Sequence, residues 1–218
     1  MRIADTLRYL FFLVVVRPLV LVVLGLNVRH RERLPTRGPA IVVANHNSHL
    51  DTLVLMTLFR QRLLPSLRPV AAVDYFMSRP WLRWFVTQII GIIPLDRRFR
   101  ASAGDPLRGC DEALEQGGIL ILFPEGSRGE PEDLAGLKTG IAHLAQRRPE
   151  VPVVPVFLHG LGKALPKGET LLVPFFCDVF VGGALFWTGD RGSFMARLDE
   201  RMRTLAAEGR FPTWESGT

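Results

Sequence analysis

The sequence predicts an α/β fold, in which a mostly parallel sheet is flanked by helices and preceded by an N-terminal membrane-associated helical segment. Beyond Pro35, short apolar runs bounded by turn residues alternate with stretches of helical periodicity. The runs are continuously apolar, which is typical of strands that helices cover on both faces. A length of 218 residues suits one domain with a short appendage. We therefore expect two units, residues 1–34 as the membrane-associated apolar segment with its basic flank and residues 35–218 as the main domain.

The N-terminal segment is almost uninterruptedly apolar from Tyr9 to Val28. That length just spans a bilayer, but Arg17 and Pro18 fall near its middle, where a charge is costly to insert and proline removes a helical hydrogen bond. A tilted span, two short segments in one leaflet, a buried core helix and a signal peptide all remain open, although no clear cleavage site is present. The denser basic flank, residues 28–33, favours a cytoplasmic main domain and could attract anionic headgroups.

Four apolar runs are the expected strands of the main domain, and a later segment, residues 171–186, is expected to be rich in strands. The four runs are AIVVA (residues 40–44), PVAAV (69–73), ILILF (119–123) and VVPVFL (153–158).

Four further segments have the pattern of helices. One of them has Asp105 as its cap and Pro106 at the first helical position, and it stops at Gly117. The segment RPWLRWFVTQII is rich in aromatic residues, which suits a helix at a membrane interface. The expected helices are residues 79–90, 105–117, 134–148 and 193–209.

Composition restricts the partners. The chain has 27 basic and 21 acidic residues, a net charge of +6, and a mean hydropathy of +0.19. This balance suits an anionic membrane face or a phosphorylated substrate. No nucleic-acid-binding module is recognisable, so we expect no nucleic-acid partner. Cys110 and Cys177 form neither a C-x-x-C pair nor a disulfide framework, which is typical of two reduced thiols in a cytosolic-facing protein.

The motif NHNSHLD, residues 45–51, directly follows the first predicted strand and has three interpretations. Ser48 and Asp51 fit a helix-capping motif, in which Asp51 folds back on the helix start. Alternatively, His46, His49 and Asp51 are three ligands of a metal ion. In the third interpretation Asp51 orients the His46 imidazole, whose other nitrogen takes a proton from a hydroxyl; no serine nucleophile is needed if that hydroxyl belongs to the substrate. The pattern alone leaves all three open.

The motif FPEGSRG, residues 123–129, also follows a predicted strand. Its flanking glycines let the backbone approach a ligand closely, and Arg128 offers a planar fork suited to phosphate. A strand-ending turn with a surface salt bridge between Glu125 and Arg128 explains the motif equally well. Both motifs occupy the carboxyl ends of strands, where the active sites of α/β folds gather.

Taken in order, these motifs resemble the conserved blocks of the glycerolipid acyltransferase superfamily, and most of all the 1-acylglycerol-3-phosphate (lysophosphatidic acid) acyltransferases. Ser127 stands where threonine is commoner in the family, and both residues carry a hydroxyl. The resemblance extends over residues 39–157 at family-like spacing. The matching blocks are NH....D (45–51), GIIPLDRR (91–98), FPEGSRG (123–129) and VPVVPV (151–156), with LKTG (137–140) as a Lys/Gly element that often follows the third block.

The resemblance implies that His46 is the general base on the acceptor hydroxyl and that Asp51 is its orienting partner. His49 lies in a variable spacer and receives no role. No metal and no cofactor are expected, because acyl-CoA or acyl carrier protein is a co-substrate. The implied substrate-binding residues are Arg97, Glu125, Gly126, Ser127 and Arg128 around the acceptor and its phosphate, and Pro155 on the acyl side.

The activity that the resemblance implies is O-acyl transfer in phospholipid biosynthesis. A fatty acyl group would move from acyl-CoA or acyl carrier protein onto the free hydroxyl of a lysophospholipid, with 1-acylglycerol-3-phosphate as the first candidate acceptor and phosphatidic acid as product. Another acceptor, such as a lyso-ornithine lipid, and a metal-dependent hydrolase are the alternatives. The expected partners are the acceptor, the thioester donor and a membrane surface. The expected location is the inner (cytoplasmic) membrane, with the catalytic domain, residues 35–218, facing the cytoplasm.

Overall fold

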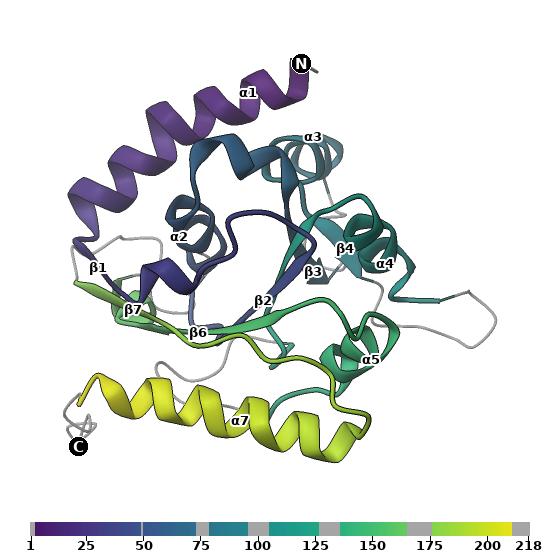
Figure 1. The fold of residues 1–218 in the computed structure, drawn as a ribbon. Helices are drawn as coiled ribbons and strands as arrows, with labels where there is room; N and C mark the ends of the chain where they lie inside the picture. Colours follow the sequence, from purple (N-terminus) through teal and green to yellow (C-terminus); the bar gives the residue numbers. More distant parts are fainter. Residues whose placement is uncertain are drawn as a thin grey trace.

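The computed structural model describes residues 3–48, 50–72, 79–95, 105–126, 136–164 and 176–210. In this part of the chain seven strands form one sheet in the order β1-β7-β6-β2-β5-β3-β4. The five strands from β6 to β4 are parallel; β7 pairs antiparallel with β6, and β1 pairs parallel with β7. Helices lie on both faces of this sheet (Figure 1). The predicted α/β class with a mostly parallel sheet is confirmed.

The four predicted strands form with ends shifted by at most two residues, and β7 lies inside the segment expected to be rich in strands. The short edge strands β1 and β4 were not expected. The bounds are β1 (Leu26–Arg29), β2 (Ala40–Ala44), β3 (Leu67–Ala72), β4 (Ile93–Leu95), β5 (Ile119–Leu122), β6 (Val153–His159) and β7 (Cys177–Val181).

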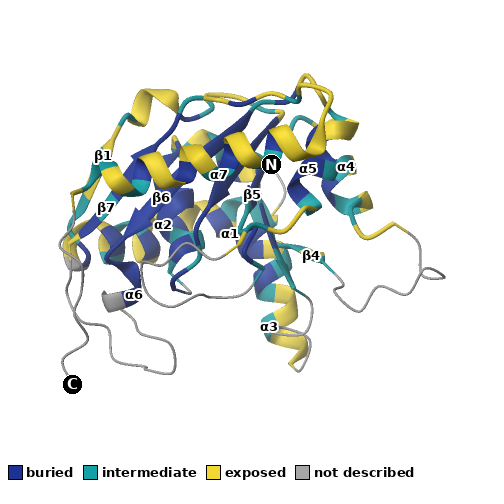
Figure 2. Cartoon of the chain, turned by 90° about the horizontal axis from the view of Figure 1, so that it is seen from below, coloured by how far each residue is buried: buried dark blue, intermediate teal, exposed yellow. Residues whose placement is uncertain are grey.

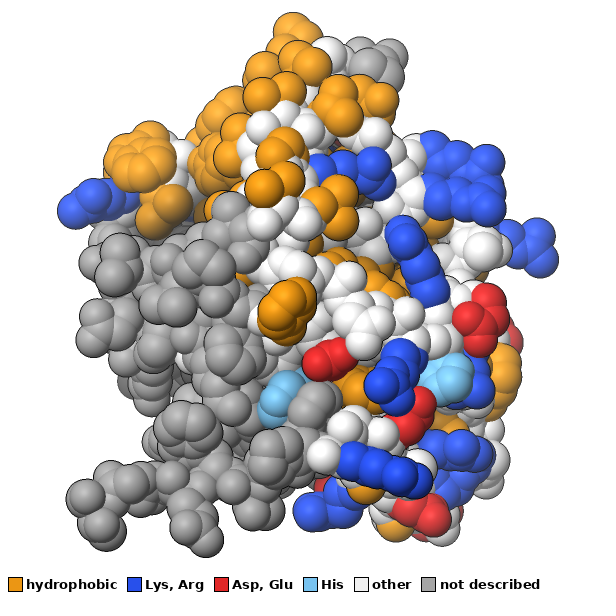
Figure 3. Space-filling model, turned by 90° about the vertical axis from the view of Figure 1, so that its left-hand side faces the viewer, with side chains coloured by type: hydrophobic (Ala, Val, Ile, Leu, Met, Phe, Trp, Pro, Cys, Tyr) orange, Lys and Arg blue, Asp and Glu red, His pale blue; other side chains and the backbone are white. Residues whose placement is uncertain are grey.

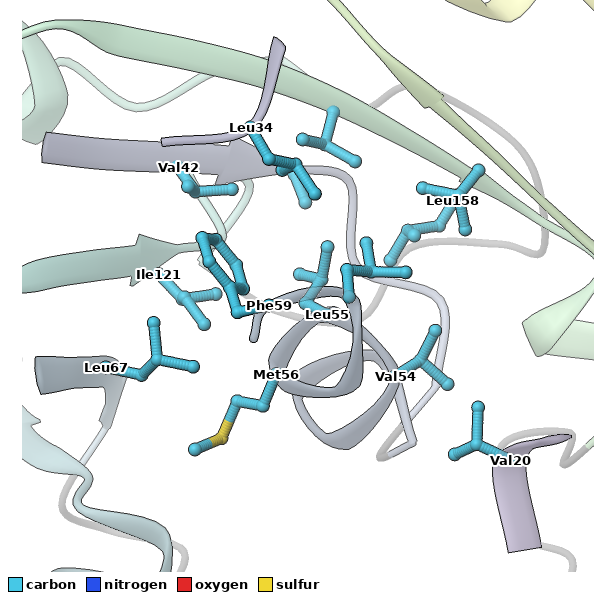
Figure 4. Close-up of a cluster of buried hydrophobic side chains, with 14 of the residues drawn as sticks. Val20, Leu34, Val42, Val54, Leu55, Met56, Phe59, Leu67, Ile121 and Leu158 are labelled. Carbon is cyan, nitrogen blue, oxygen red and sulfur yellow. The ribbon is translucent and has the colours of Figure 1, made fainter. Parts of the chain in front are cut away.

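One face of the sheet packs against α2 (Asp51–Leu58) and the N-terminal helical segment. The other face packs against α4 (Arg108–Glu115), α5 (Gly140–Arg147) and α7 (Arg191–Glu208). Colouring by burial shows the buried strands between these helix layers (Figure 2). Side chains of α2 lie among those of four strands and Val20 of the N-terminal segment in Figure 4, which labels Val42, Val54, Leu55, Met56, Leu67, Ile121 and Leu158.

The N-terminal segment is helical through its central proline. It comprises α1 (Ile3–Phe11), η1 (Phe12–Val16) and η2 (Leu19–Val23), the last two being π-helical turns. Arg17 and Pro18 between them keep helical angles, with φ/ψ of −62°/−49° and −57°/−43°. Proline has no N–H to donate, and wide π-type turns accommodate the missing hydrogen bond. Pro18 therefore does not divide this segment into two.

The two sides of the N-terminal segment differ. One side belongs to the main core and is formed by Phe12, Val16, Val20 and Leu24. The other side is apolar and exposed, with Ile3, Leu7, Tyr9, Leu10, Leu13, Val14, Val15, Leu21 and Val22. Among the described residues, no helix has both the length and the apolar character needed to cross a bilayer.

Arg8 anchors the start of this segment. Its guanidinium donates to the carbonyl oxygens of Ile89 (2.7 Å) and Gln88 (3.3 Å) in η6 (Phe85–Ile90), and of Leu64 (2.9 Å) in η4 (Gln61–Ser66). Carbonyls at a helix end lack the usual helical donor, so Arg8 supplies a donor to those of Gln88 and Ile89 and a second donor to that of Leu64, which also accepts from the Leu67 N–H. Burial lowers the pKa of Arg8 to about 10, which leaves it charged at neutral pH.

The basic flank is partly engaged in the fold. Arg31, in η3 (Arg31–Arg33), donates to the carbonyl oxygen of Leu58 at 2.8 Å, and Arg33 donates to that of Val181 at 3.2 Å. In addition, β1 takes part in the sheet although it lies within residues 1–34. The division of the chain at residue 34 stays a prediction.

Three helix starts differ from the prediction. The helix α5 begins at Gly140, later than expected within residues 134–148, because the N–H of Lys138 donates to the carbonyl oxygen of Pro124 and not to a helical partner. The helix α4 begins at Arg108, after Pro106, because the Asp105 carboxylate accepts from the Leu107 N–H (3.0 Å) and from Arg147 of α5 (2.5 Å) and so caps a turn before the helix. The helix α7 begins earlier than expected because Asp190 is its N-cap. The aromatic segment forms α3 (Pro80–Trp84), which continues into η6, and a short α6 (Leu161–Ala164) follows β6.

Candidate active site

The NHNSHLD motif lies at the centre of one edge of the sheet. The strand β2 is paired with β5 on one side and with β6 on the other, all three parallel. Their carboxyl ends therefore meet at the same edge, where α/β proteins place their ligands. The residues that follow β2 and β5 are the two motifs selected from the sequence, so the fold brings them together.

His46 and Asp51 form a hydrogen-bonded pair. The Nδ1 atom of His46 lies 2.9 Å from Oδ2 of Asp51, which is fully buried. The same oxygen accepts from the backbone N–H groups of Asn47 (2.7 Å) and Ser48 (2.8 Å). Asp51 thus stabilises the start of α2 and orients the imidazole, so the capping and acid–base interpretations both describe this carboxylate.

The pairing determines which nitrogen of His46 can take a proton. An ionised carboxylate only accepts hydrogen bonds, so Nδ1 carries the hydrogen and Nε2 is left with a free lone pair. The His46 side chain is 21% exposed, so it is not sealed from solvent. Its ring stacks on that of Phe123 after β5, with centroids 4.3 Å apart and planes 25° apart. The His46 ring is therefore fixed on two sides, by Asp51 and by Phe123, and its role as a general base stays a prediction.

Asn45 joins the end of β2 to the end of β6. Its side chain donates to the carbonyl oxygen of Leu158 (2.8 Å) and accepts from the Leu158 N–H (2.7 Å), and Asn47 donates to the same carbonyl oxygen (3.3 Å). Neither asparagine is among the site residues predicted from the sequence. A polar side chain directly after a buried strand was the available signal, but its partner comes from a strand more than a hundred residues away.

The second motif forms a tight turn after β5. The N–H of Gly126 donates to the carbonyl oxygen of Phe123 (3.0 Å), and Gly126 has a φ of +75°, which favours glycine. Glu125 is buried beside it. The N–H of Lys138 donates to the carbonyl oxygen of Pro124 (2.9 Å), which brings the start of the LKTG element against this turn.

The other predicted site residues have different outcomes. Arg97, Ser127 and Arg128 lie outside the described residues, so their roles stay predictions. Pro155 lies inside β6, where its ring is next to Gly182 and on the α7 side of the sheet. Its predicted contact with the acyl group also stays a prediction.

The metal interpretation is not supported within the described residues, where no group of three or more His, Cys, Asp or Glu side chains could hold an ion. His49, its third ligand, lies outside them.

Both thiols are poor nucleophiles in this fold. Burial, and then the charges of Asp51 and Asp178, raise the pKa of Cys177 to about 12. Burial raises the pKa of Cys110 to about 11, with the charges of neighbouring aspartates adding to the effect. A thiol reacts as its thiolate, so neither cysteine is suited to carry an acyl group at neutral pH.

The fold and this site agree with the comparisons with known proteins. Residues 25–159, more than half of the chain, match the family model "Acyltransferase". The chain therefore belongs to the acyltransferase family.

The chain is similar to several 1-acyl-sn-glycerol-3-phosphate acyltransferases. It is 33% identical to the chloroplastic LPAT1 of Arabidopsis thaliana over 145 residues, which cover 66% of this chain and 38% of the relative. It is 36% identical to the Saccharomyces cerevisiae enzyme over 138 residues, which cover 61% of this chain and 43% of the relative. The chain thus matches about two fifths of the length of these relatives.

A solved structure shares the fold. The crystal structure of the 1-acyl-sn-glycerophosphate acyltransferase PlsC from Thermotoga maritima superposes with a TM-score of 0.76 at 20% identity, covering 97% of this chain and 81% of that one. At this identity the likeness supports the fold and not the activity.

Proposed function

We propose that this protein is a membrane-associated O-acyltransferase that converts 1-acylglycerol-3-phosphate to phosphatidic acid, with acyl-CoA or acyl carrier protein as the acyl donor. The observation that carries the proposal is the oriented His46–Asp51 pair at the carboxyl edge of the sheet. The names of the similar proteins supply the acceptor, since those proteins are 1-acyl-sn-glycerol-3-phosphate acyltransferases.

In this reaction Nε2 of His46 takes the proton of the acceptor hydroxyl while the hydroxyl oxygen attacks the thioester carbonyl carbon. The C–O bond forms and a tetrahedral oxyanion results. When the oxyanion collapses, the C–S bond breaks, and the leaving sulfur receives the proton from Nε2. The buried charge of Asp51 stabilises the imidazolium between the two steps. No acyl-enzyme is needed, because the thioester is already activated and both substrates are held together.

A membrane surface would present the lipid acceptor to this edge. The η2 turn leads into β1, whose first residue pairs with Cys177 at the start of β7. Because β7 runs antiparallel to β6, this start lies at the carboxyl edge of the sheet, where β6 ends. Exposed Leu21, Val22 and Phe176 lie there on one side of the site. On the other side, α3 connects the carboxyl end of β3 to β4 and exposes Trp81 and Trp84.

These apolar groups have the composition of an interfacial surface. Figure 3 shows hydrophobic side chains gathered at the top of the molecule, over the N-terminal helical segment, and Figure 2 shows α3 extending beyond the sheet. The N-terminal helical segment is apolar on its exposed side as well as on its buried side. A helix of this kind is normally covered on both sides, by protein or by lipid. Tryptophan favours the headgroup level, and the exposed Arg79 and Arg83 next to the tryptophans would attract anionic lipid. These groups support a membrane surface facing the carboxyl edge of the sheet, and we propose the cytoplasmic face of the inner membrane as that surface.

The proposed contact of this apolar surface with a membrane is tested by sedimentation with vesicles containing anionic lipid. We expect Trp81→Ala/Trp84→Ala to reduce the bound fraction, because two interfacial anchors are lost. Phe186→Ala is the matched control, since Phe186 is also exposed but adjoins Leu185, which pairs with the start of β6 at the opposite edge. Equal loss in both variants, or no loss in either, would contradict the placement.

The activity is tested by thioester release from oleoyl-CoA and from oleoyl acyl carrier protein with a panel of acceptors. The panel contains lysophosphatidic acid, lysophosphatidylcholine and a lyso-ornithine lipid. We expect release that depends on lysophosphatidic acid, together with formation of phosphatidic acid. Release that depends on another lysolipid would preserve the chemistry and replace the acceptor. No release from either donor with any acceptor would overturn the proposal.

A further inference from the structure

We propose that the ammonium of Lys138 binds a phosphate group of a substrate at the carboxyl edge of the sheet, which makes it a binding residue additional to those expected from the sequence. The inference rests on the proposed function. It is drawn from the position of Lys138 relative to the turn after β5, from the glycine beneath its side chain, and from the absence of a partner for its charge among the described residues.

The backbone holds Lys138 at the site. Its N–H donates to the carbonyl oxygen of Pro124, and Pro124 directly follows Phe123, whose ring stacks on His46. A series of contacts therefore links His46 to Lys138, although the two residues lie far apart in the sequence. The His46 ring contacts Phe123, and the next residue, Pro124, accepts the hydrogen bond from Lys138. The backbone of Lys138 is thus fixed next to the turn that carries Phe123.

The side chain of Lys138 lies across Gly126. A Cβ atom on Gly126 would be 2.3 Å from Nζ of Lys138, 2.8 Å from Cε and 2.9 Å from Cδ. Real Cβ atoms do not approach other atoms so closely, so any other residue at this position would displace the ammonium. Gly126 thus has two functions, since it allows the positive φ of the turn and leaves room for a cation beside the buried Glu125.

The charge of Lys138 has no partner in the described part of the chain. The side chain is exposed, and no hydrogen bond or ion pair of its ammonium occurs among the described residues. An ammonium with three donors at the mouth of a site suits a phosphate, which offers several acceptor oxygens and a full negative charge. Phosphate is present on both proposed substrates, as the phosphomonoester of the acceptor and as the phosphates of the donor carrier.

The test is steady-state kinetics of Lys138→Met and Lys138→Arg beside the wild type, with lysophosphatidic acid and oleoyl-CoA varied in turn. Methionine keeps an unbranched stem without the charge, and arginine keeps the charge. Arg201→Met is the matched control, because Arg201 is an exposed cation on α7, on the other face of the sheet from α2.

We expect Lys138→Met to raise one KM about tenfold with a much smaller change in kcat, since a lost hydrogen bond between charged groups at an exposed site weakens binding by about that factor. A rise in the KM for lysophosphatidic acid assigns Lys138 to the acceptor phosphate, and a rise in the KM for oleoyl-CoA assigns it to the donor. Lys138→Arg should restore most of the affinity, and Arg201→Met should behave as wild type.

A second variant keeps Lys138 and fills the space beside Gly126 that its side chain occupies. Gly126→Ala should raise the same KM, because the added methyl group displaces the ammonium and because alanine strains the turn at a φ of +75°; the assignment to the charge therefore comes from Lys138→Met and Lys138→Arg. Unchanged KM values in Lys138→Met, or a rise that Arg201→Met reproduces, would overturn the inference while the wild-type activity leaves the proposed function intact. A wild type without acyl transfer would overturn both.

Discussion

Asp51 has two functions in the structure, and two substitutions separate them. Its Oδ2 atom accepts from the N–H groups of Asn47 and Ser48 at the start of α2 and from Nδ1 of His46. Asp51→Ala removes all three interactions. Asp51→Asn keeps an oxygen that can accept from the two backbone groups but removes the negative charge that stabilises an imidazolium.

The contacts of Asp51 determine how much each substitution should change the free energy of unfolding and kcat. Asp51→Ala leaves two buried N–H groups without an acceptor, at about 1–3 kcal/mol each, or about 2–6 kcal/mol in total. This is a large part of the free energy of unfolding of a typical domain, about 5–15 kcal/mol. Asp51→Asn should cost about 1–2 kcal/mol, because the acceptor remains. Its kcat should nevertheless fall about 100- to 10,000-fold, the range that a positioned acid–base group contributes.

The assay combines urea unfolding with thioester release on the same preparations. We expect Asp51→Asn to unfold near the wild-type urea midpoint and to be almost inactive. We expect Asp51→Ala to be both inactive and clearly less stable. A folded Asp51→Asn protein with a kcat close to that of the wild type would refute the acid–base role and leave Asp51 as a helix cap only.

Two further predictions concern buried groups away from the reaction. Arg8→Met should lower the free energy of unfolding by about 2–4 kcal/mol, because the carbonyl oxygens of Gln88 and Ile89 lose their side-chain donor and that of Leu64 keeps only the Leu67 N–H. A urea midpoint equal to the wild type would contradict the anchoring role of Arg8. With thiol pKa values near 11 and 12 for Cys110 and Cys177, only about 0.1% or less of each is thiolate at pH 8, so a thiol reagent should label native protein far more slowly than denatured protein. Because the pKa values of both thiols are raised in the native protein, the free energy of unfolding should fall above pH 9, where the unfolded thiols ionise and the native ones do not. Rapid labelling of native protein at pH 8 would contradict both expectations.

Much of the fold could be predicted because each central strand is a continuous apolar run that is recognisable in the sequence. Residues 40–44 and 119–122 are buried along their whole length or nearly so, and continuous apolar runs of this kind arise only where helices cover both faces of a sheet. The edge strands β1 and β4 lack that signal. β1 alternates between partly buried and exposed residues inside an apolar segment, and β4 has only three residues.

The same contrast holds for the site. His46 and Asp51 are five residues apart, so a local turn is enough to join them, and the motif could be read from the sequence. The partners of Asn45 and His46 on other strands could not, because Leu158 and Phe123 meet them only through the order of strands in the sheet. The contact between Gly126 and Lys138 depends in the same way on the path of the chain between two elements. Pairing across the sheet is a tertiary property that no single segment encodes.

The central claim is that His46, oriented by Asp51, takes the proton of an acceptor hydroxyl. The most direct measurement is phosphatidic acid formation from lysophosphatidic acid and oleoyl-CoA or oleoyl acyl carrier protein by the wild type and by His46→Ala, each first shown by circular dichroism and urea unfolding to be folded. The account predicts product that requires the acceptor in the wild type and no detectable product in the variant. Substantial turnover by folded His46→Ala protein would contradict it.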